Sequence, residues 1–175
     1  MTQPNPCASW KRSLAIVWIG EFFSSTNFMA QAQATLVRAF GLGTGAWALW
    51  ADLDRKKVRA RHYDARMAMP LTWDEDGVTK CAFVTRTFYR GMVVDQLQMH
   101  LLGGLGTYRI DTVCFDHEGN QIEADGVLPS YETGCPFPTF SIVKPAIDNT
   151  RVDMSPYGES VFADAIDAIQ AVDLS

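Results

Sequence analysis

The chain has 175 residues, of which 47% are hydrophobic and 20% are charged, and its formal net charge is −5 at pH 7. This composition excludes a disordered chain, and the length is typical of one domain, or two small subdomains, with a buried core. The acidic balance argues against a surface that grips nucleic acid by its phosphates, although DNA could still slide along such a protein.

The sequence contains four cysteines, Cys7, Cys81, Cys114 and Cys135. Their spacing fits neither a zinc site nor a CxxC redox motif. Cys81 and Cys114 lie in apolar alternating stretches and are predicted to be small buried side chains, which suits a reducing compartment. We expect no signal peptide and no membrane contact, because the apolar run at residues 14–19 is short and Glu21 interrupts it.

Residues 1–26 are predicted to form an N-terminal apolar helical segment, with residues 9–23 apolar at helical spacing. Residues 24–27 (SSTN) indicate a helix start, because each of these side chains can accept a hydrogen bond from a free backbone amide. A second helix is predicted over residues 28–40, ended by Gly41. Its apolar stripe consists of Met29, Ala32, Leu36 and Phe40.

The apolar pattern changes to a period of two between residues 45 and 123, which predicts an antiparallel β meander. Turns are expected at residues 52–56, 74–77, 103–106 and 116–120. The predicted strands include residues 57–63, 80–90, 92–102 and 108–115. Residues 126–154 form a connector that is irregular and proline-containing at first, and an apolar strand begins within it at Ser141.

A C-terminal amphipathic helix is predicted over residues 155–174, with Ser155 as its cap and Pro156 in its first turn. Its apolar stripe, which we expect to pack on the rest of the chain, consists of Val161, Phe162, Ala165, Ile166, Ile169 and Val172. Asp164 and Asp167 fall on the solvated side. Its end carries no cation, so the helix is interpreted as cut short. The predicted class is α+β: two N-terminal helices, the meander, and this helix, with residues 27–175 as the main body.

No catalytic, cofactor or metal site is predicted. Residues 41–45 (GLGTG) resemble half of a dinucleotide fingerprint, but a helix precedes them and a strand follows, which is the reverse of what that site needs. His62, His100 and His117 have no metal-binding spacing; the first two are expected in strands with local hydrogen bonds and the third in a turn. Ser130, Ser141 and Ser155 lack a nucleophile context.

Two charged clusters keep alternative interpretations. Asp74, Glu75 and Asp76, like Asp52 with Asp54, could do acid–base work or hold Mg²⁺, but the first cluster precedes Gly77 and fits a solvated turn. The basic run could be a solvated sheet edge that resists unwanted pairing, or a contact with an acidic neighbour or with DNA. It consists of Arg55, Lys56, Lys57, Arg59 and Arg61.

A series of short segments, in order along residues 30–174, resembles the portal proteins of tailed bacteriophages, in the branch common among siphophages of Gram-positive hosts. The most specific is residues 144–149 (KPAIDN) followed by residues 155–167 (SPYGESVFADAID). The others are residues 32–47, 70–73 (PLTW), 77–87 (GVTKCAFVTRT) and 96–100 (QLQMH).

The resemblance implies a structural subunit, without enzymatic activity or cofactors, of a usually twelve-membered ring at one capsid vertex. Such rings self-associate, pass double-stranded DNA during packaging and ejection, and contact terminase, capsid and connector proteins. The expected location is the virion, and the host cytoplasm during assembly. Family members are considerably longer, so the chain is interpreted as a truncated fragment that forms no stable closed ring by itself.

A second hypothesis, from a different class, is a small α+β ligand-binding or enzymatic domain whose site the sequence does not reveal. A deep polar pocket with converging ionisable groups would favour that hypothesis. A shallow surface with an exposed apolar helix face would favour the assembly protein.

Overall fold

The computed structural model describes residues 19–52, 56–124, 127–147, 149–165 and 172. Of these residues, 45% lie in strands and 18% in helices, so the protein is mostly β and the predicted α+β class is wrong. One reason is that the connector contains β8 (Ser130–Glu132), which was not predicted, besides the predicted apolar strand, which is β9 (Phe140–Val143). Another is that residues 155–162, predicted to be helical, are turns or irregular backbone.

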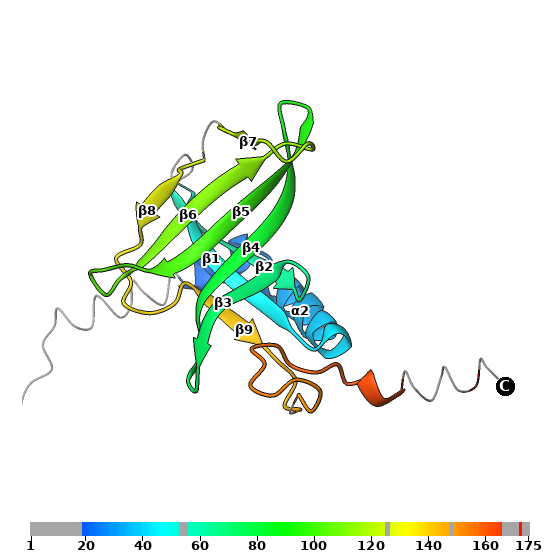
Figure 1. Ribbon diagram of the computed structural model, residues 1–175. Helices are drawn as coiled ribbons and strands as arrows, with labels where there is room; N and C mark the ends of the chain where they lie inside the picture. The colour runs from blue at the N-terminus through cyan, green and yellow to red at the C-terminus, as the bar shows by residue number, and fades with distance from the viewer. Residues whose placement is uncertain (1–18, 53–55, 125–126, 148, 166–171, 173–175) are drawn as a thin grey trace, which may run out of the picture.

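The strands form two antiparallel sheets instead of one meander (Figure 1). The small sheet has the order β2-β1-β9, and the large sheet has the order β3-β4-β5-β6-β7, with β8 also paired to β6. The chain therefore passes from one sheet to the other between β2 and β3. The remaining strands are β1 (Gly45–Asp52), β2 (Lys57–Asp64), β3 (Ala68–Asp74), β4 (Gly77–Tyr89), β5 (Met92–Leu102), β6 (Tyr108–Phe115) and β7 (Gln121–Ile122).

The predicted strands at residues 92–102 and 108–115 are confirmed to the residue by β5 and β6. The turn at residues 116–120 is confirmed as well, because Asp116 Oδ1 accepts hydrogen bonds from the amides of Glu118 and Asn120. Long strands with polar turns are therefore the part of the fold that periodicity located best.

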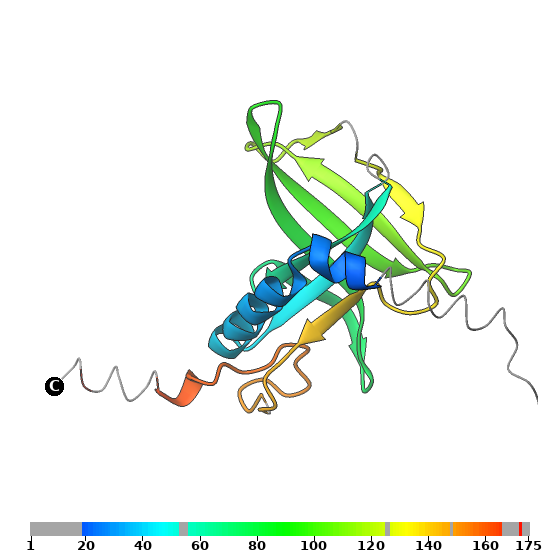
Figure 2. The same cartoon turned by 180° about the vertical axis from the view of Figure 1, so that it is seen from behind.

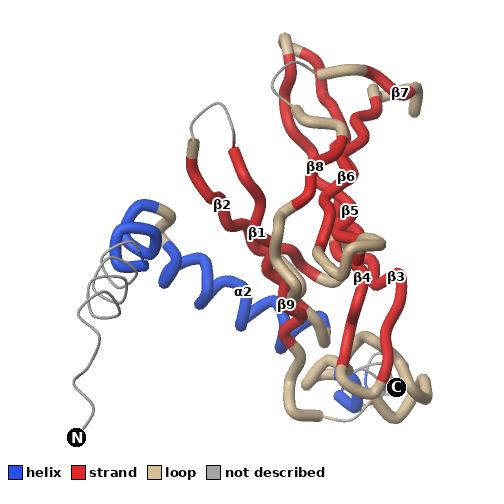
Figure 3. Tube along the Cα trace, turned by 90° about the vertical axis from the view of Figure 1, so that its left-hand side faces the viewer, coloured by secondary structure: helices blue, strands red, loops and turns tan. Residues whose placement is uncertain are grey.

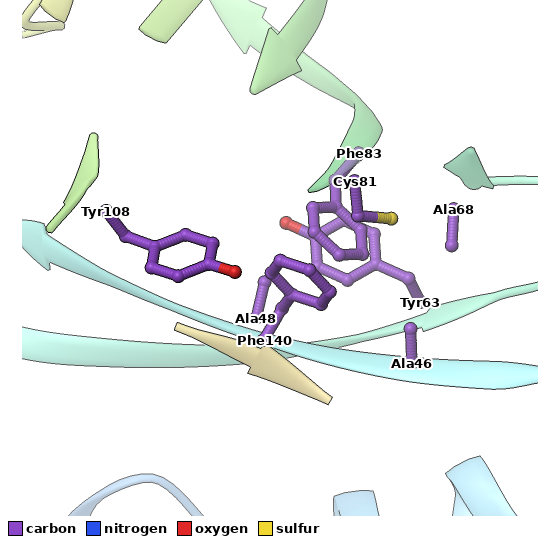
Figure 4. Packing of buried hydrophobic residues seen from close by; sticks show 8 residues of the cluster. All are labelled: Ala46, Ala48, Tyr63, Ala68, Cys81, Phe83, Tyr108 and Phe140. Atoms are coloured by element: carbon purple, nitrogen blue, oxygen red, sulfur yellow. The ribbon is translucent and has the colours of Figure 1, made fainter. Parts of the chain in front are cut away.

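The elements lie in three layers, with α2 (Phe28–Leu42) on one face of the small sheet and the large sheet on the other (Figure 3). The core lies between the two sheets and combines small side chains with aromatic rings (Figure 4). Small residues let the sheets approach, and the rings fill the remaining space. Its members are Ala46, Ala48, Tyr63, Ala68, Cys81, Phe83, Tyr108 and Phe140.

Helix α2 packs on the small sheet through small side chains. Thr35 and Ala39 are each 1% exposed, and Gly45 of β1 lies so close that an added Cβ would meet Thr35 Cγ2 at 3.1 Å. The predicted stripe of Met29, Leu36 and Phe40 consequently faces outward. Sequence periodicity marked the apolar side of the helix correctly, but close packing selected the small-residue side.

Contrary to the prediction, residues 24–27 do not cap the start of α2 with their side chains. Residues 19–25 are helical, and the hydroxyls of Ser24 and Thr26 donate back to the carbonyls of Gly20 and Phe22 at 2.9 and 2.7 Å. Asn27 precedes α2 in the left-handed conformation and makes no side-chain capping bond. These polar side chains therefore close one helical segment instead of opening the next. The part of the predicted first helix before residue 19 lies outside the described residues.

The C-terminal helix begins later than predicted. Helical backbone is described at residues 163–165 and 172, whereas Ser155 accepts a bond from the amide of Tyr157 within a turn. The amide of Phe162 donates to Ser160 Oγ at 3.1 Å, so Ser160 takes the capping role that was predicted for Ser155. Phe162 is 60% exposed, which contradicts its predicted packing on the body. Asp164 is exposed as predicted; Ile166, Asp167 and Ile169 lie outside the described residues.

Candidate assembly site

The glycine run after α2 meets the C-terminal segment at a close backbone crossing, which we call the junction. Gly43, and not the predicted Gly41, ends the helix, with a φ of 81° that favours glycine. A Cβ on Gly43 would overlap the carbonyl of Gly158, and a Cβ on Gly158 would contact Lys144 and Pro145. The two chain segments can therefore cross at the junction only because neither carries a side chain there.

Hydrogen bonds fix the chain on both sides of this crossing. The amide of Gly158 donates to Thr44 Oγ1 at 2.9 Å, and Ser160 Oγ donates to the carbonyl of Gly41 at 2.8 Å. The amide of Val161 donates to the carbonyl of Phe40 at 3.1 Å. The last carbonyls of α2, which have no partner within the helix, are thus satisfied by residues more than one hundred positions away.

A polar network closes the loop that precedes the junction. Glu159 accepts bonds from the amide and hydroxyl of Thr150, both at 3.2 Å, and from Arg151 Nε at 2.8 Å. The amide hydrogen bond of Thr150, with smaller contributions from Arg151, holds the pKa of Glu159 below its usual value. Arg151 also donates to the carbonyl of Ala163 at 3.2 Å. This carboxylate therefore organises the backbone where the C-terminal helical turn begins.

Two aromatic side chains attach the same loop to the large sheet. Tyr157 donates its hydroxyl to the carbonyl of Ala68 at 3.1 Å, and Trp73 Nε1 donates to the carbonyl of Met154 at 3.0 Å. Figure 2 shows the loop and the start of the C-terminal helical turn, in orange, beneath the carboxyl end of α2. The junction thus fixes the place and direction in which the chain leaves the body.

A second feature is the outer face of α2, which is apolar and exposed. Met29 is 77% exposed, Val37 67%, Leu36 50% and Phe40 48%. These four side chains recur at helical spacing and so form one continuous stripe. Large exposed side chains gathered on one face are typical of a surface that another protein covers.

A third feature is a groove of ≈ 640 Å³ between α2, β2 and β4, which we call the arginine groove. Arg59 pairs with Asp52 at 3.3 Å, and Arg86 pairs with Asp95 through two bonds of 2.8 and 2.9 Å. The other two arginines contact a neutral ring each. The groove is lined by Ser25, Thr26, Gln31, Arg38, Trp50, Arg59, Ala60, Arg61, His62, Met67, Thr85 and Arg86.

Arg38 and His62 share a hydrogen bond of 3.0 Å, and the Arg61 guanidinium lies 5.6 Å from the centre of the Trp50 ring. Burial, followed by the charges of Arg38 and Arg61, lowers the pKa of His62, which keeps this imidazole neutral at pH 7. Because a guanidinium only donates, the hydrogen bond identifies Nε2 as the acceptor. The positive charge of the groove therefore comes from arginine alone.

The basic run is partly confirmed as an edge, because β2 is an outer strand of the small sheet. Within it, Arg59 and Arg61 line the arginine groove, and Lys56 and Lys57 are exposed elsewhere; Arg55 lies outside the described residues. Sequence reasoning missed the groove because Arg38 and Arg86 come from distant elements. The one signal in the sequence that could have indicated the groove was Arg38 in a helix next to the basic strand that contains Arg59 and Arg61.

The other histidines and the buried cysteine considered as candidates have structural positions, in the core or in a turn. His100 is fully buried in β5, where its Nδ1 is 2.7 Å from Thr139 Oγ1, and burial lowers its pKa to about 4. Burial likewise raises the pKa of Cys81 to about 12, so this thiol is not a nucleophile near neutral pH. His117 lies in the predicted turn, and Cys7 lies outside the described residues.

The acidic cluster is a solvated turn, as predicted. Asp74, Glu75 and Asp76 are exposed at the end of the β3–β4 hairpin, and Asp74 Oδ1 accepts bonds from the amides of Asp76 and Gly77.

Across the residues that the structure describes, no group of three or more His, Cys, Asp or Glu side chains could hold a metal ion. No helix within that same part of the chain is long and apolar enough to cross a membrane. No protein-family model matches the chain, and no curated protein matches it either.

Proposed function

We propose that the chain is a structural assembly protein, the body of a subunit of a phage portal. The observation that carries the assembly role is the outer face of α2, where Met29, Leu36, Val37 and Phe40 are about half exposed or more. A folded protein gains solubility by covering such a stripe, and in a ring the natural cover is a second copy of the same chain.

The family part of the proposal is supported by where the resembling segments lie. Residues 41–45, Lys144 with Pro145, and residues 155–160 are far apart in sequence but meet at the junction. The segment at residues 144–149 and 155–167 is the most specific match, and each of the others alone is weak. Each of the two crossing segments restricts the other, because glycine is required at both Gly43 and Gly158 where they cross. Such a restriction is expected when the segments form one structural element that a family has in common.

The alternative, a ligand-binding or enzymatic domain, has less support. The arginine groove is the pocket with converging ionisable groups that would favour it, yet among the described residues its lining contains four arginines and no carboxylate or thiol. With His62 neutral and bonded to Arg38, the groove offers binding of negative charge more readily than proton transfer.

As a portal subunit, the chain would reside at one vertex of the virion, after assembly in the host cytoplasm. Its partners would be further copies of itself, the terminase, capsid and connector proteins, and the double-stranded DNA that passes through the ring. The proposal assigns the chain no catalysis and no cofactor, because the energy for packaging would come from the motor.

The test is labelling of phage particles released by a host that carries the gene. Gold-conjugated antibodies against this chain should label a single vertex of each particle, and particles should be lost or empty when the gene is deleted. Label on every vertex, or its absence from particles, would contradict the proposal. A terminase gene on one side and capsid genes on the other would support it independently.

A further inference from the structure

Within the part of the chain that the structure describes, the lining of the arginine groove carries more positive charge than its two ion pairs offset. Two of its four arginines, Arg59 and Arg86, are paired with aspartates. Arg38 and Arg61 contact the uncharged rings of His62 and Trp50, and the charge of Arg38 also acts on the carboxylate of Asp64. Two guanidinium groups at the wall of a hollow, each with several N–H donors, are suited to bind carboxylates or phosphates.

The same chain presents the opposite charge on a protruding turn. Asp74, Glu75 and Asp76, together the acidic tip, are exposed at the end of the β3–β4 hairpin, which projects beyond the large sheet in Figure 1. The backbone bonds to Asp74 Oδ1, at 3.0 and 3.2 Å, hold the turn in one conformation. A preformed turn loses little entropy when it docks.

The tip and the groove lie far apart, because Gly77 beside the tip and Arg86 in the groove are nine residues apart along β4, about 30 Å of extended strand. The hollow beside the tip is lined by Trp73, Phe140, Lys144 and their neighbours, and it shares no residue with the arginine groove. A tip therefore reaches a groove only on another copy. Such a contact joins unlike surfaces, and repetition of an unlike contact produces a ring or an open filament.

We propose that the arginine groove of one copy binds the acidic tip of a second copy of this chain, in a head-to-tail contact. The inference rests on the proposed self-assembling function and assigns its interface. Arg38 lies beside Val37 in α2, so a neighbour whose tip enters the groove would also cover part of the outer face of α2.

A carboxylate-bearing turn fits the site better than DNA does. The groove is a bounded hollow of ≈ 640 Å³ and not an extended basic surface. The chain as a whole carries a net charge of −5, which repels a polyanion of duplex length. A short turn brings only three carboxylates to the guanidinium groups. A DNA duplex would also bring many further phosphates close to the acidic surface of the chain.

The test uses charge reversal on each side, measured by sedimentation of the full chain. Arg38→Glu with Arg61→Glu reverses the groove, and Glu75→Lys with Asp76→Lys reverses the tip while Asp74 keeps the turn. Each double variant alone should self-associate at least about tenfold more weakly than the wild type, because like charges then face each other. Raising the salt from about 50 to about 500 mM should weaken the wild-type contact in the same direction.

A mixture of the two double variants should associate about as tightly as the wild type, since each copy then offers the partner that the other requires. The four-fold variant should recover as well, which separates loss of contact from loss of folding. Failure of both to recover, or no wild-type association at low salt, overturns the inference but leaves the particle labelling to decide the function. Groove-dependent binding of a DNA duplex without any effect of the tip would also overturn it.

Discussion

The core between the two sheets and the outer flank, made of α2 and the C-terminal segment, are stabilised in different ways. In the core, Phe83 and Ala46 are fully buried, and rings fill the space that small residues leave. In the flank, Phe40 and Phe162 are 48% and 60% exposed, and backbone hydrogen bonds make the attachment. The difference indicates that the core supplies most of the stability of the fold, whereas the flank leaves large apolar side chains exposed.

The largest expected effect separates two phenylalanines of one strand. Phe83 of β4 is fully buried, so Phe83→Ala should lower the free energy of unfolding by about 3–5 kcal/mol. Phe88, five residues along the same strand, is 78% exposed, and Phe88→Ala should cost less than about 0.5 kcal/mol. Urea denaturation of both variants checks this, and equal losses would mean that the core is placed wrongly.

The core also predicts a dependence of stability on pH, through His100. Burial lowers the pKa of His100 from 6.5 to about 4, so the unfolded chain binds a proton that the folded chain refuses. This contribution to stability is complete above pH 6.5 and is lost as the pH falls towards 4. The loss should be on the order of 3 kcal/mol.

His100→Gln is the control, because the amide keeps polar atoms but does not titrate in this range. The difference in unfolding free energy between wild type and variant should shrink as the pH falls from 6.5 to 4, after which the carboxylates affect both proteins alike. A constant difference would show that His100 takes up its proton in the folded protein as readily as in the unfolded chain.

A smaller effect is expected in the flank, at the glycine crossing. Gly43→Ala should cost about 2 kcal/mol, because the residue has a φ of 81° and its Cβ would overlap the carbonyl of Gly158. Gly41 lies within α2, and a Cβ there would meet nothing within 4 Å. Gly41→Ala should therefore be neutral or stabilise the protein by about 0.5 kcal/mol. Thermal melts distinguish the two, and equal destabilisation would contradict the assignment of the crossing.

The sequence predicted the strands better than their arrangement. Alternation located β5 and β6 because polar turns bound both strands. It placed all strands in one meander because alternation carries no information on which strands pair. The division between β2 and β3 depends on packing across the core, such as that of Tyr63 of β2 on Phe83 of β4 with ring centres 4.6 Å apart, and contacts between distant residues leave no local pattern.

The candidate site was predictable only in parts. The glycines of residues 41–45 were correctly interpreted as residues that let the backbone turn. Their partner Gly158 was not predicted, because a close crossing of two segments depends on tertiary structure. The outward face of α2 was missed because apolar spacing indicates burial on average. Here Thr35 and Ala39 allow a closer approach to Gly45 than Leu36 or Phe40 would, and the sheet therefore selects the small side of the helix.

The smallest expected effect concerns the residue for which sequence periodicity was most misleading. Phe162 belongs to the predicted buried stripe, yet it is 60% exposed, so Phe162→Ala should change the free energy of unfolding by less than about 0.5 kcal/mol. Asp164→Ala, at another exposed position, should do equally little. Denaturation in parallel tests the pair: a loss above about 2 kcal/mol for Phe162→Ala alone would mean that this ring packs on the body. Indistinguishable melts would assign Phe162 to the exposed surface of the flank.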